Sequence, residues 1–361
     1  MKHIHVYTLF LMSVFHTSCV GQNQPNARPD NISKGLYSES QVKEGSKVPM
    51  SMVRNIKQAR NGDILIASYL GVFRYDGRSF TNLTSKISPP RFSSFWDVLE
   101  DRKGNLWFGT RDSGVYLLPS GKTTFQHFTT KQGLASNMAT HIYEDKTGTI
   151  WVGSDRYDPS ASLRTGGKSF RNFTTKDGFP SNNIRLLLED KTGKRWFGAQ
   201  GENMFVYDGK TFTVLKNEDG KAFNNVWSII EDKKGNIWFG DVDGLWRYDP
   251  SAALSTGSST FTNVSQRGAY AIIEDKKGNI WTTGTVNNIW ALSRYDAESL
   301  YSNEPTVTEI KSQSAMLLGI LEDAKGNIWF GSGGGVYRYD ARLPDGQGKT
   351  ITDFKSKEDQ K

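Results

Sequence analysis

One ten-residue pattern recurs along the chain, and its period constrains the fold more than any other feature. It is most regular as EDKKGNIWFG at 231–240, with an acidic pair, a glycine and a tryptophan at fixed spacing. The tryptophan stands at positions 107, 151, 196, 238, 281 and 329, so successive copies are 44, 45, 42, 43 and 48 residues apart. A degenerate copy, ARNGDILIAS at 59–68, places Leu65 in the same column and adds a seventh repeat. A period of about 44 residues is typical of β-propeller blades.

Each repeat also contains four short stretches that are rich in β-branched and aromatic residues and bounded by Gly, Asp, Asn or Pro. In one repeat these are a run that ends in the acidic pair at 231–232, then NIWFG, GLWRYD at 244–249, and FTNV at 261–264. Helical periodicity is absent outside the N-terminal segment. The sequence therefore predicts an all-β fold, a seven-bladed β-propeller of four-stranded antiparallel blades, over residues 49–355.

The repeated motif has a structural explanation in this fold. Asp232 can cap the turn between two strands by accepting backbone N–H bonds, and Gly235 supplies the positive φ of a tight hairpin. Trp238 then packs between neighbouring blades, where its ring N–H needs one partner. Because a catalytic centre is needed only once, the near-identity of the copies favours a packing role over a chemical one.

The N-terminal residues have the pattern of an export signal. Lys2 provides a positive start, and IHVYTLFLMSVF at 4–15 is an apolar run too short to span a bilayer as a helix. The following HTSC ends in Cys19, the single cysteine of the chain, and small residues before a cysteine resemble a bacterial lipobox. We expect a lipoprotein-type signal peptide at 1–18 and a lipid on Cys19, with an ordinary secretory signal as the alternative.

The segments on either side of the repeats are polar. Residues 19–48 contain many Asn, Pro, Ser and Gly and predict a flexible tether, and residues 356–361 predict a short C-terminal tail. We therefore expect a propeller in the periplasm or at the outer membrane of a bacterial envelope, attached to the membrane only through its lipid.

The repeats resemble a known family. GFPSNNIRLLLEDKTGKRWFGAQ at 178–200 and GLASNMATHIYEDKTGTIWVGS at 133–154 are similar to the two-component regulator propeller repeat, and the resemblance extends over roughly 50–355. The family implies seven-bladed propellers that face the periplasm, sense ligands, often glycans, and are commonly joined to a histidine kinase. Because the sequence stops at Lys361, just after the seventh repeat, we expect no kinase domain and no membrane-spanning helix here.

Closure of the ring allows two arrangements. The first repeat begins with its own inner strand, MVRNIKQ at 52–58, and the seventh ends with its own outer strand, TITDF at 350–354. With both in place, the first and last blades close by side-chain packing. Alternatively, GLYSESQV at 35–42 joins the last blade as a sealing strand.

The candidate binding residues lie at the channel mouth, where the inner strands begin. Four residues before the glutamate of each repeat, the column varies while the motif stays constant. Aromatic side chains stack on sugar faces, and arginine forks bind carboxylate or sulfate, although packing between blades is an equal alternative. The column reads Arg54, Trp96, Thr140, Arg185, Trp227, Tyr270 and Leu318, and polar candidates in nearby loops are Arg111, Asp155, Arg156, Gln200 and Asp241.

The sequence favours binding or sensing over catalysis. Beyond the signal there are two histidines, His127 and His141, and there is no Gly-x-Ser-x-Gly or His-Glu-x-x-His motif. We expect no catalytic residue, metal or cofactor, and an oligosaccharide or an envelope protein as partner. The alternatives are a metal-dependent lyase resembling streptogramin lyases, which are seven-bladed propellers with a His and Glu magnesium site, and a pure protein scaffold.

The net charge of +7 is compatible with acidic partners, but because Lys and Glu are interspersed, a simple contribution to solubility is the favoured interpretation. Nucleic acid is disfavoured, because export separates the protein from it and the basic residues lie in turns rather than in one stripe.

Overall fold

The structure is a computed structural model. It describes residues 48–87, 94–160, 168–181, 185–198, 201–241, 244–251, 261–302, 304–343 and 350–355, all within one compact unit, Glu44–Lys361. The predicted signal peptide, Cys19, the tail at 356–361, Gln200 and the tether apart from Val48 lie outside these residues. None of the described helices has the length and apolar character needed to cross a membrane.

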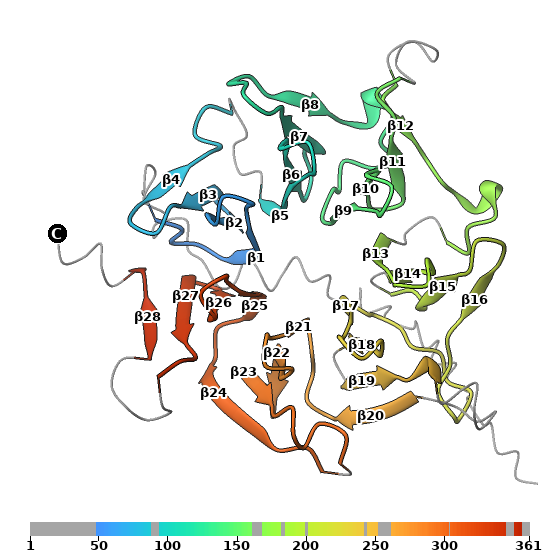
Figure 1. Ribbon diagram of the computed structural model, residues 1–361. Coiled ribbons are helices and arrows are strands. Elements are labelled where there is room, and N and C mark those ends of the chain that lie inside the picture. The colour runs from blue at the N-terminus through green and yellow to red at the C-terminus, as the bar shows by residue number, and fades with distance from the viewer. Residues whose placement is uncertain are drawn as a thin grey trace, which may run out of the picture. The chain divides into compact units, whose positions relative to one another are not determined.

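Seven four-stranded antiparallel sheets form the blades, and each uses four consecutive strands. Figure 1 shows them arranged in a ring, with the first strand of each blade innermost. The predicted seven-bladed propeller is confirmed.

The first four blades contain β1 (Val53–Gln58), β2 (Ile64–Ser68), β3 (Gly71–Tyr75), β4 (Phe80–Asn82), β5 (Phe95–Glu100), β6 (Leu106–Thr110), β7 (Val115–Leu118), β8 (Gln126–Phe128), β9 (Ile142–Glu144), β10 (Ile150–Val152), β11 (Asp155–Tyr157), β12 (Phe170–Arg171), β13 (Arg185–Glu189), β14 (Arg195–Gly198), β15 (Phe205–Tyr207) and β16 (Phe212–Val214). The last three contain β17 (Ser228–Glu231), β18 (Ile237–Gly240), β19 (Leu245–Tyr248), β20 (Phe261–Ser265), β21 (Ala271–Glu274), β22 (Ile280–Val286), β23 (Ile289–Tyr295), β24 (Val307–Gln313), β25 (Leu317–Glu322), β26 (Asn327–Ser332), β27 (Gly335–Asp340) and β28 (Ile351–Asp353). Two short 3-10 helices, η2 (Thr130–Gln132) and η3 (Thr175–Asp177), lie in blade connections.

The turn of the repeated motif is built as the sequence predicts. The Asp232 carboxylate accepts the backbone N–H of Asn236 at 2.8 Å and the ring N–H of Trp238 at 2.8 Å, and Gly235 has a φ of 90°. All six tryptophans of the column donate to the aspartate six residues earlier, at 2.8 to 2.9 Å. The aspartate thus caps its own turn and satisfies a buried tryptophan at once.

The glutamate of the acidic pair has a different role, which the sequence analysis did not assign. It accepts a backbone N–H from the preceding blade, donated by the residue after the aspartate or, in the degenerate first repeat, by Arg60 after Ala59. The bonds are Arg60 to Glu100 at 2.7 Å, Arg102 to Glu144 at 3.0 Å, Lys146 to Glu189 at 2.8 Å, Lys191 to Glu231 at 2.8 Å, Lys233 to Glu274 at 2.9 Å and Lys276 to Glu322 at 2.8 Å. Gln58 completes the circle by accepting from Ala324 at 2.9 Å.

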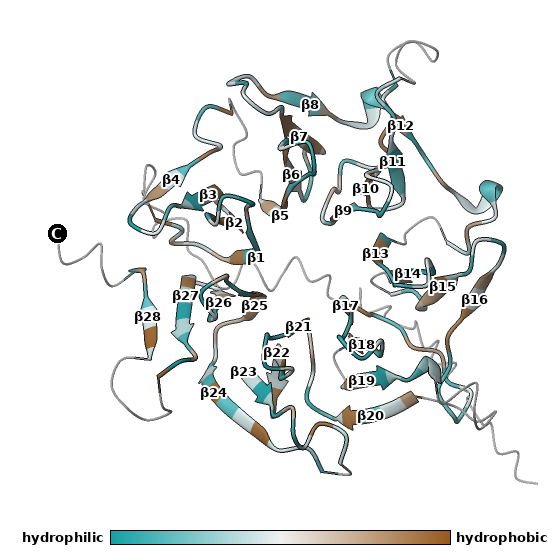
Figure 2. Cartoon of the chain, viewed as in Figure 1, coloured by the Kyte–Doolittle hydropathy of each residue, from teal (hydrophilic) through white to brown (hydrophobic). Residues whose placement is uncertain are grey.

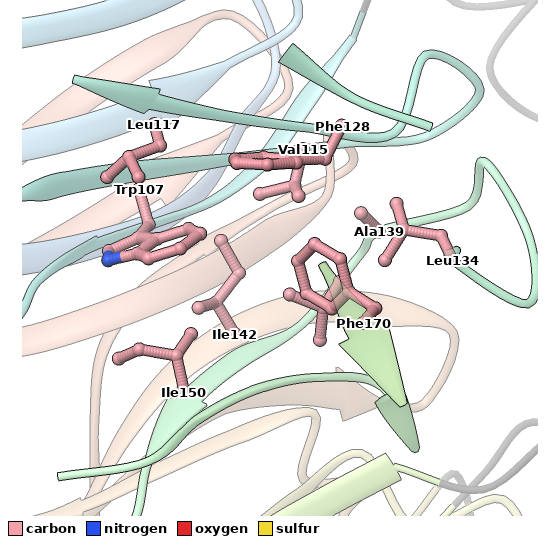
Figure 3. Packing of buried hydrophobic residues seen from close by; sticks show 10 residues of the cluster. Trp107, Val115, Leu117, Phe128, Leu134, Ala139, Ile142, Ile150 and Phe170 are labelled. Carbon is pink, nitrogen blue, oxygen red and sulfur yellow. The ribbon is translucent and has the colours of Figure 1, made fainter. Parts of the chain in front are cut away.

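Apolar side chains fill the space between blades. In Figure 3, Trp107 and Phe128 of one blade pack with Ile142, Ile150 and Phe170 of the next. Figure 2 shows apolar segments in the inner strands β1, β5, β13 and β25, while the connecting segments are mainly hydrophilic. The buried tryptophans of the repeated motif therefore act as packing residues between blades.

The ring closes by packing between β1 and the last blade. A Cβ on Gly331 would lie 2.6 Å from the carbonyl oxygen of Val53, and one on Gly319 would lie 2.8 Å from the Cα of Asn55. Val53 also shares a core cluster with Trp329. This is the first of the two expected arrangements; the alternative sealing strand at 35–42 lies outside the described residues.

Candidate functional site

The predicted column lies at one end of the propeller, where the inner strands begin. Arg54, Trp96 and Arg185 stand in the first two positions of β1, β5 and β13, while Trp227 and Tyr270 directly precede β17 and β21. We call these residues, with Thr140 and Leu318, the mouth column. Leu318 is buried, and the other members are partly exposed. Because neighbouring strands are antiparallel, the loops between second and third strands lie at the same end.

Neighbouring members of the mouth column contact one another across blades. The Arg54 guanidinium carbon lies 4.0 Å from the ring centroid of Trp96, and that of Arg185 lies 5.0 Å from the ring of Trp227. Arg185 Nη1 also donates to the Thr140 hydroxyl oxygen at 3.4 Å. These distances are within the range of attraction between a cation and an aromatic face.

The aromatic surface continues from Trp227 to a residue that the sequence analysis missed. The ring centroids of Trp227 and Tyr270 are 6.3 Å apart, and those of Tyr270 and Trp290 are 4.8 Å apart. Trp290 lies in β23, just after the β22–β23 turn at Asn287 and Asn288, which have φ values of 50° and 64°. These two strands have seven residues each, whereas β18 and β19 of the preceding blade have four. The 48-residue interval after Trp281 was the signal for this extension.

A polar cluster lies beside the mouth column on the inner strands. Asp97 is buried, accepts from Asn55 Nδ2 at 2.6 Å and from the backbone N–H of Ile142 at 2.7 Å, and lies 3.5 Å from His141 Nδ1. Burial raises the pKa of Asp97 to about 6, against the charge of Lys57 and these hydrogen bonds, which lower it. At neutral pH the carboxylate is therefore ionised.

The two basic residues of this polar cluster, His141 and Arg185, have pKa values far below and well above neutral pH. Burial lowers the pKa of His141 to about 3, and the charges of Arg185 and Lys57 lower it further. Burial also lowers the pKa of Arg185 to about 10, while Asp97 raises it. At neutral pH, His141 is therefore neutral and Arg185 is charged.

Several polar atoms here have no hydrogen-bond partner among the described residues although they are buried. They are Trp96 Nε1, His141 Nε2, and Arg185 Nε and Nη2. Leaving a buried donor unsatisfied costs about 1–3 kcal/mol. Such atoms therefore mark the place where the mouth has unused hydrogen-bonding capacity.

The loop candidates of blade 3 are not brought to the mouth column. The buried Asp155 carboxylate accepts from the backbone N–H of Ala135 and from Asn172 Nδ2, both at 2.8 Å, so it holds a loop together. Arg156 lies within β11 opposite Trp151, and its guanidinium lies 5.7 Å from the ring of Phe173. Arg156 was expected in a loop, but only two residues separate β10 from β11, so Asp155, Arg156 and Tyr157 form the third strand.

Two further loop candidates contribute to turns. Asp241 is buried and accepts the backbone N–H of Gly244 at 2.8 Å, as expected of a turn residue. Arg111 is partly exposed in the β6–β7 loop, where its backbone N–H donates to Ser94 at 3.0 Å. Gln200 lies outside the described residues.

Comparison with known proteins agrees with the repeat pattern. The family model described as two component regulator propeller matches residues 90–112, 133–156 and 220–243. Three stretches of the chain thus match the two-component regulator propeller repeat. A curated relative named histidine kinase P4, from Formosa agariphila, is 30% identical over 93 residues, which are 24% of this chain and 7% of that protein.

Solved structures share the fold of this repeat protein. The extracellular domain of a hybrid two-component system from B. thetaiotaomicron has a TM-score of 0.63 at 20% identity, covering 82% of this chain and 42% of that one. Virginiamycin B lyase from Staphylococcus aureus has a TM-score of 0.56 at 16% identity, covering 79% and 93%. PorZ of the type-IX secretion system of Porphyromonas gingivalis has a TM-score of 0.56 at 16% identity, covering 84% and 48%. At these identities the likeness shows the fold alone.

Proposed function

We propose that this chain is an extracytoplasmic sensing propeller that binds a glycan at the mouth column and does not turn it over. The observation that carries the proposal is the continuous contact of Arg185, Trp227 and Tyr270 across three blades. Trp227 and Tyr270 are partly exposed and present surface to a ligand, and Arg185 is partly exposed as a residue although its Nε and Nη2 atoms are buried. Sites that combine aromatic surface with a few convergent polar groups are typical of small-ligand binding.

The cellular setting follows from the sequence and from the relatives. An export signal that ends at Cys19 supports a lipid-anchored protein of the bacterial envelope. The matched family model and the structural neighbour, the extracellular domain of a hybrid two-component system, support a role in two-component signalling. An envelope protein could bind the same face, and the glycan experiment below separates these partners.

A lyase is the competing function, because virginiamycin B lyase shares the fold. The described residues do not fit a magnesium site of the His and Glu type, since no three His, Cys, Asp or Glu side chains among them gather closely enough to hold a metal.

The test is glycan binding by the propeller unit, residues 44–361, first on a glycan array and then by calorimetry. We expect Trp227→Ala to weaken binding of a hit about tenfold, because a stacking face is lost. Tyr301→Ala is the matched control: Tyr301 is 40% exposed but bonds to Asp232 in a β17–β18 turn, away from the mouth column, so affinity should not change.

Two results would contradict the proposal. One is the absence of any glycan hit, and the other is unchanged affinity in Trp227→Ala. Mass spectrometry of the recovered glycan checks turnover: an unchanged mass supports binding alone, whereas a product that EDTA suppresses supports the lyase.

A further inference from the structure

We propose that the mouth takes an acidic oligosaccharide in one orientation, with its carboxylate or sulfate at Arg185 and its sugar rings along Trp227, Tyr270 and Trp290. This inference rests on the proposed function. It adds the charge of the ligand, the direction in which the ligand lies across the mouth, and a further binding residue, Trp290. Figure 1 shows the inner strands β13, β17 and β21 following one another around the ring, with β22 and β23 next to β21.

The guanidinium of Arg185 has one nitrogen that bonds to a neighbouring blade and two nitrogens without a partner among the described residues. Its guanidinium carbon lies over the ring of Trp227, 5.0 Å from the ring centroid, and Nη1 donates to the Thr140 hydroxyl oxygen at 3.4 Å. The two remaining nitrogens, Nε and Nη2, are buried and have no partner among the described residues, so an anion reaches them when neighbouring side chains at the mouth move aside. Nε and Nη2 are the two donors along one edge of the planar group, the edge that a carboxylate or sulfate accepts with two oxygens.

The charges around Arg185 leave a positive excess. Asp97 is the carboxylate that interacts with Arg185, and it also interacts with Lys57, which is exposed. His141 adds no charge at neutral pH, because burial and the two cations lower its pKa to about 3. Two cations therefore face one carboxylate, and an incoming anion would balance the second.

The row of aromatic rings beside Arg185 determines the length of the ligand that we propose. Trp227, Tyr270 and Trp290 present three rings in succession, with centroid separations of 6.3 Å and 4.8 Å. Such a surface extends beyond one ring, so a single acidic sugar would leave Trp290 unused. The stripe ends at the β22–β23 hairpin, whose Ile289 is 48% exposed. The longer strands of this blade thus lengthen the site.

The experiment compares an acidic trisaccharide with its neutral twin by calorimetry on the full chain. The probes are a trisaccharide ending in a uronic acid, its methyl ester, the corresponding sulfated trisaccharide and the free uronic acid monosaccharide. We expect the acid or the sulfate to bind at least about tenfold more tightly than the ester, because a charge-assisted bidentate pair is lost in the ester. Comparison of the acid with the sulfate identifies the anion.

Three variants divide the site. Arg185→Gln should reduce the ratio of acid to ester affinity to about 1, and Arg185→Lys should restore only part of it, because lysine keeps the charge without the fork. Trp290→Ala should weaken the trisaccharides about threefold to tenfold and leave the monosaccharide unchanged. Arg247→Gln is the control, because Arg247 lies 4.7 Å from the ring of Tyr301, outside the mouth column. Its ratio of acid to ester affinity and its affinity for the trisaccharides should equal those of the unaltered protein.

The outcomes separate the inference from the proposed function. Equal binding of acid and ester by the unaltered protein, or a persistent preference in Arg185→Gln, overturns the inference while glycan binding stands. An equal effect of Trp290→Ala on monosaccharide and trisaccharide overturns the stated orientation. Binding of neither probe, together with no hit on the array, overturns the proposed function itself. Melting temperatures of all variants identify any loss that is caused by unfolding.

Discussion

At the scale of single residues, Asp97 and His141 are in contact across two neighbouring blades, 3.5 Å apart. Burial raises the pKa of Asp97 and lowers the pKa of His141. The folded pKa of Asp97 is raised by burial from 3.8 to about 6, so the native state keeps a proton that the unfolded chain has released. Stability from this group is therefore greatest at low pH and is lost as pH rises from about 4 to about 6. His141 has its folded pKa lowered from 6.5 to about 3, so its contribution is lost as pH falls through that window.

The first prediction follows from these opposite signs. Between pH 4 and pH 6 the two contributions oppose each other, so the unaltered protein should show little dependence on pH from this pair. Asp97→Asn should make the free energy of unfolding rise with pH over that range, and His141→Gln should make it fall. Urea unfolding at several pH values measures both slopes. Identical slopes in all three proteins would show that the pair is not buried in this way.

At the scale of elements, the last glycine of the repeated motif allows the next blade to approach. A Cβ on Gly240 at the end of β18 would lie 2.2 Å from the carbonyl oxygen of Ala269, which stands two residues before β21. Gly109 meets Ala139 in the same way, also at 2.2 Å. The motif therefore ends in glycine because a neighbouring backbone occupies the place of a side chain.

This contact predicts the effect of adding one methyl group. Gly240→Ala should lower the free energy of unfolding by about 1–3 kcal/mol, because the inner strand of the next blade must move. Gly334→Ala in the β26–β27 turn is the control, since its Cβ would have no atom within 4 Å. Urea denaturation compares the two. Equal stability of both variants would mean that the blades have room to separate.

At the scale of the whole molecule, the junction between the first and last blades differs from the other six. In each of those six pairs of blades, a loop connects one blade to the next. The first blade, β1–β4, and the last blade, β25–β28, stand at opposite ends of the propeller sequence, and no loop connects them directly. The junction is held by side-chain packing around Val53 and Trp329 and by the bond from Ala324 to Gln58. It can therefore open without stretching a connecting loop.

The expected consequence is local opening at this junction. Amide hydrogens of β1 and β25 should exchange faster than those of β13 and β17, which face each other across a chain-connected junction. Hydrogen exchange followed by mass spectrometry provides the comparison. Uniform protection of all inner strands would indicate that closure is as strong as the covalently linked junctions.

The fold and the resemblance to a repeat family could be predicted from the sequence, because the repeated motif depends on the spacing of residues within a single hairpin. Six of the seven blades place a tryptophan, an aspartate and a glycine at the same local spacing, and hydrogen bonds within a hairpin connect residues only a few positions apart. Trp238, Asp232 and Gly235 could therefore be interpreted from one copy of the motif. The period then determined the number of blades.

The candidate site depended on contacts between blades, which the sequence does not display. The column of variable residues was visible, but the stacking of Arg185 on Trp227, and the addition of Trp290, depend on how three blades are placed side by side. Arg156 looked like a loop residue until strand pairing put it opposite Trp151. Contacts between residues about 40 positions apart are decided by packing geometry, and only the tertiary structure provides it.

The sequence by itself thus determined the all-β class, the seven blades and the structural role of the repeated motif, because local spacing and period encode them. Only the tertiary structure decided that each glutamate bonds to the preceding blade, that Gln58 completes this circle, and which mouth residues meet. The physical reason is that these are long-range contacts: their partners become neighbours only when the ring is assembled.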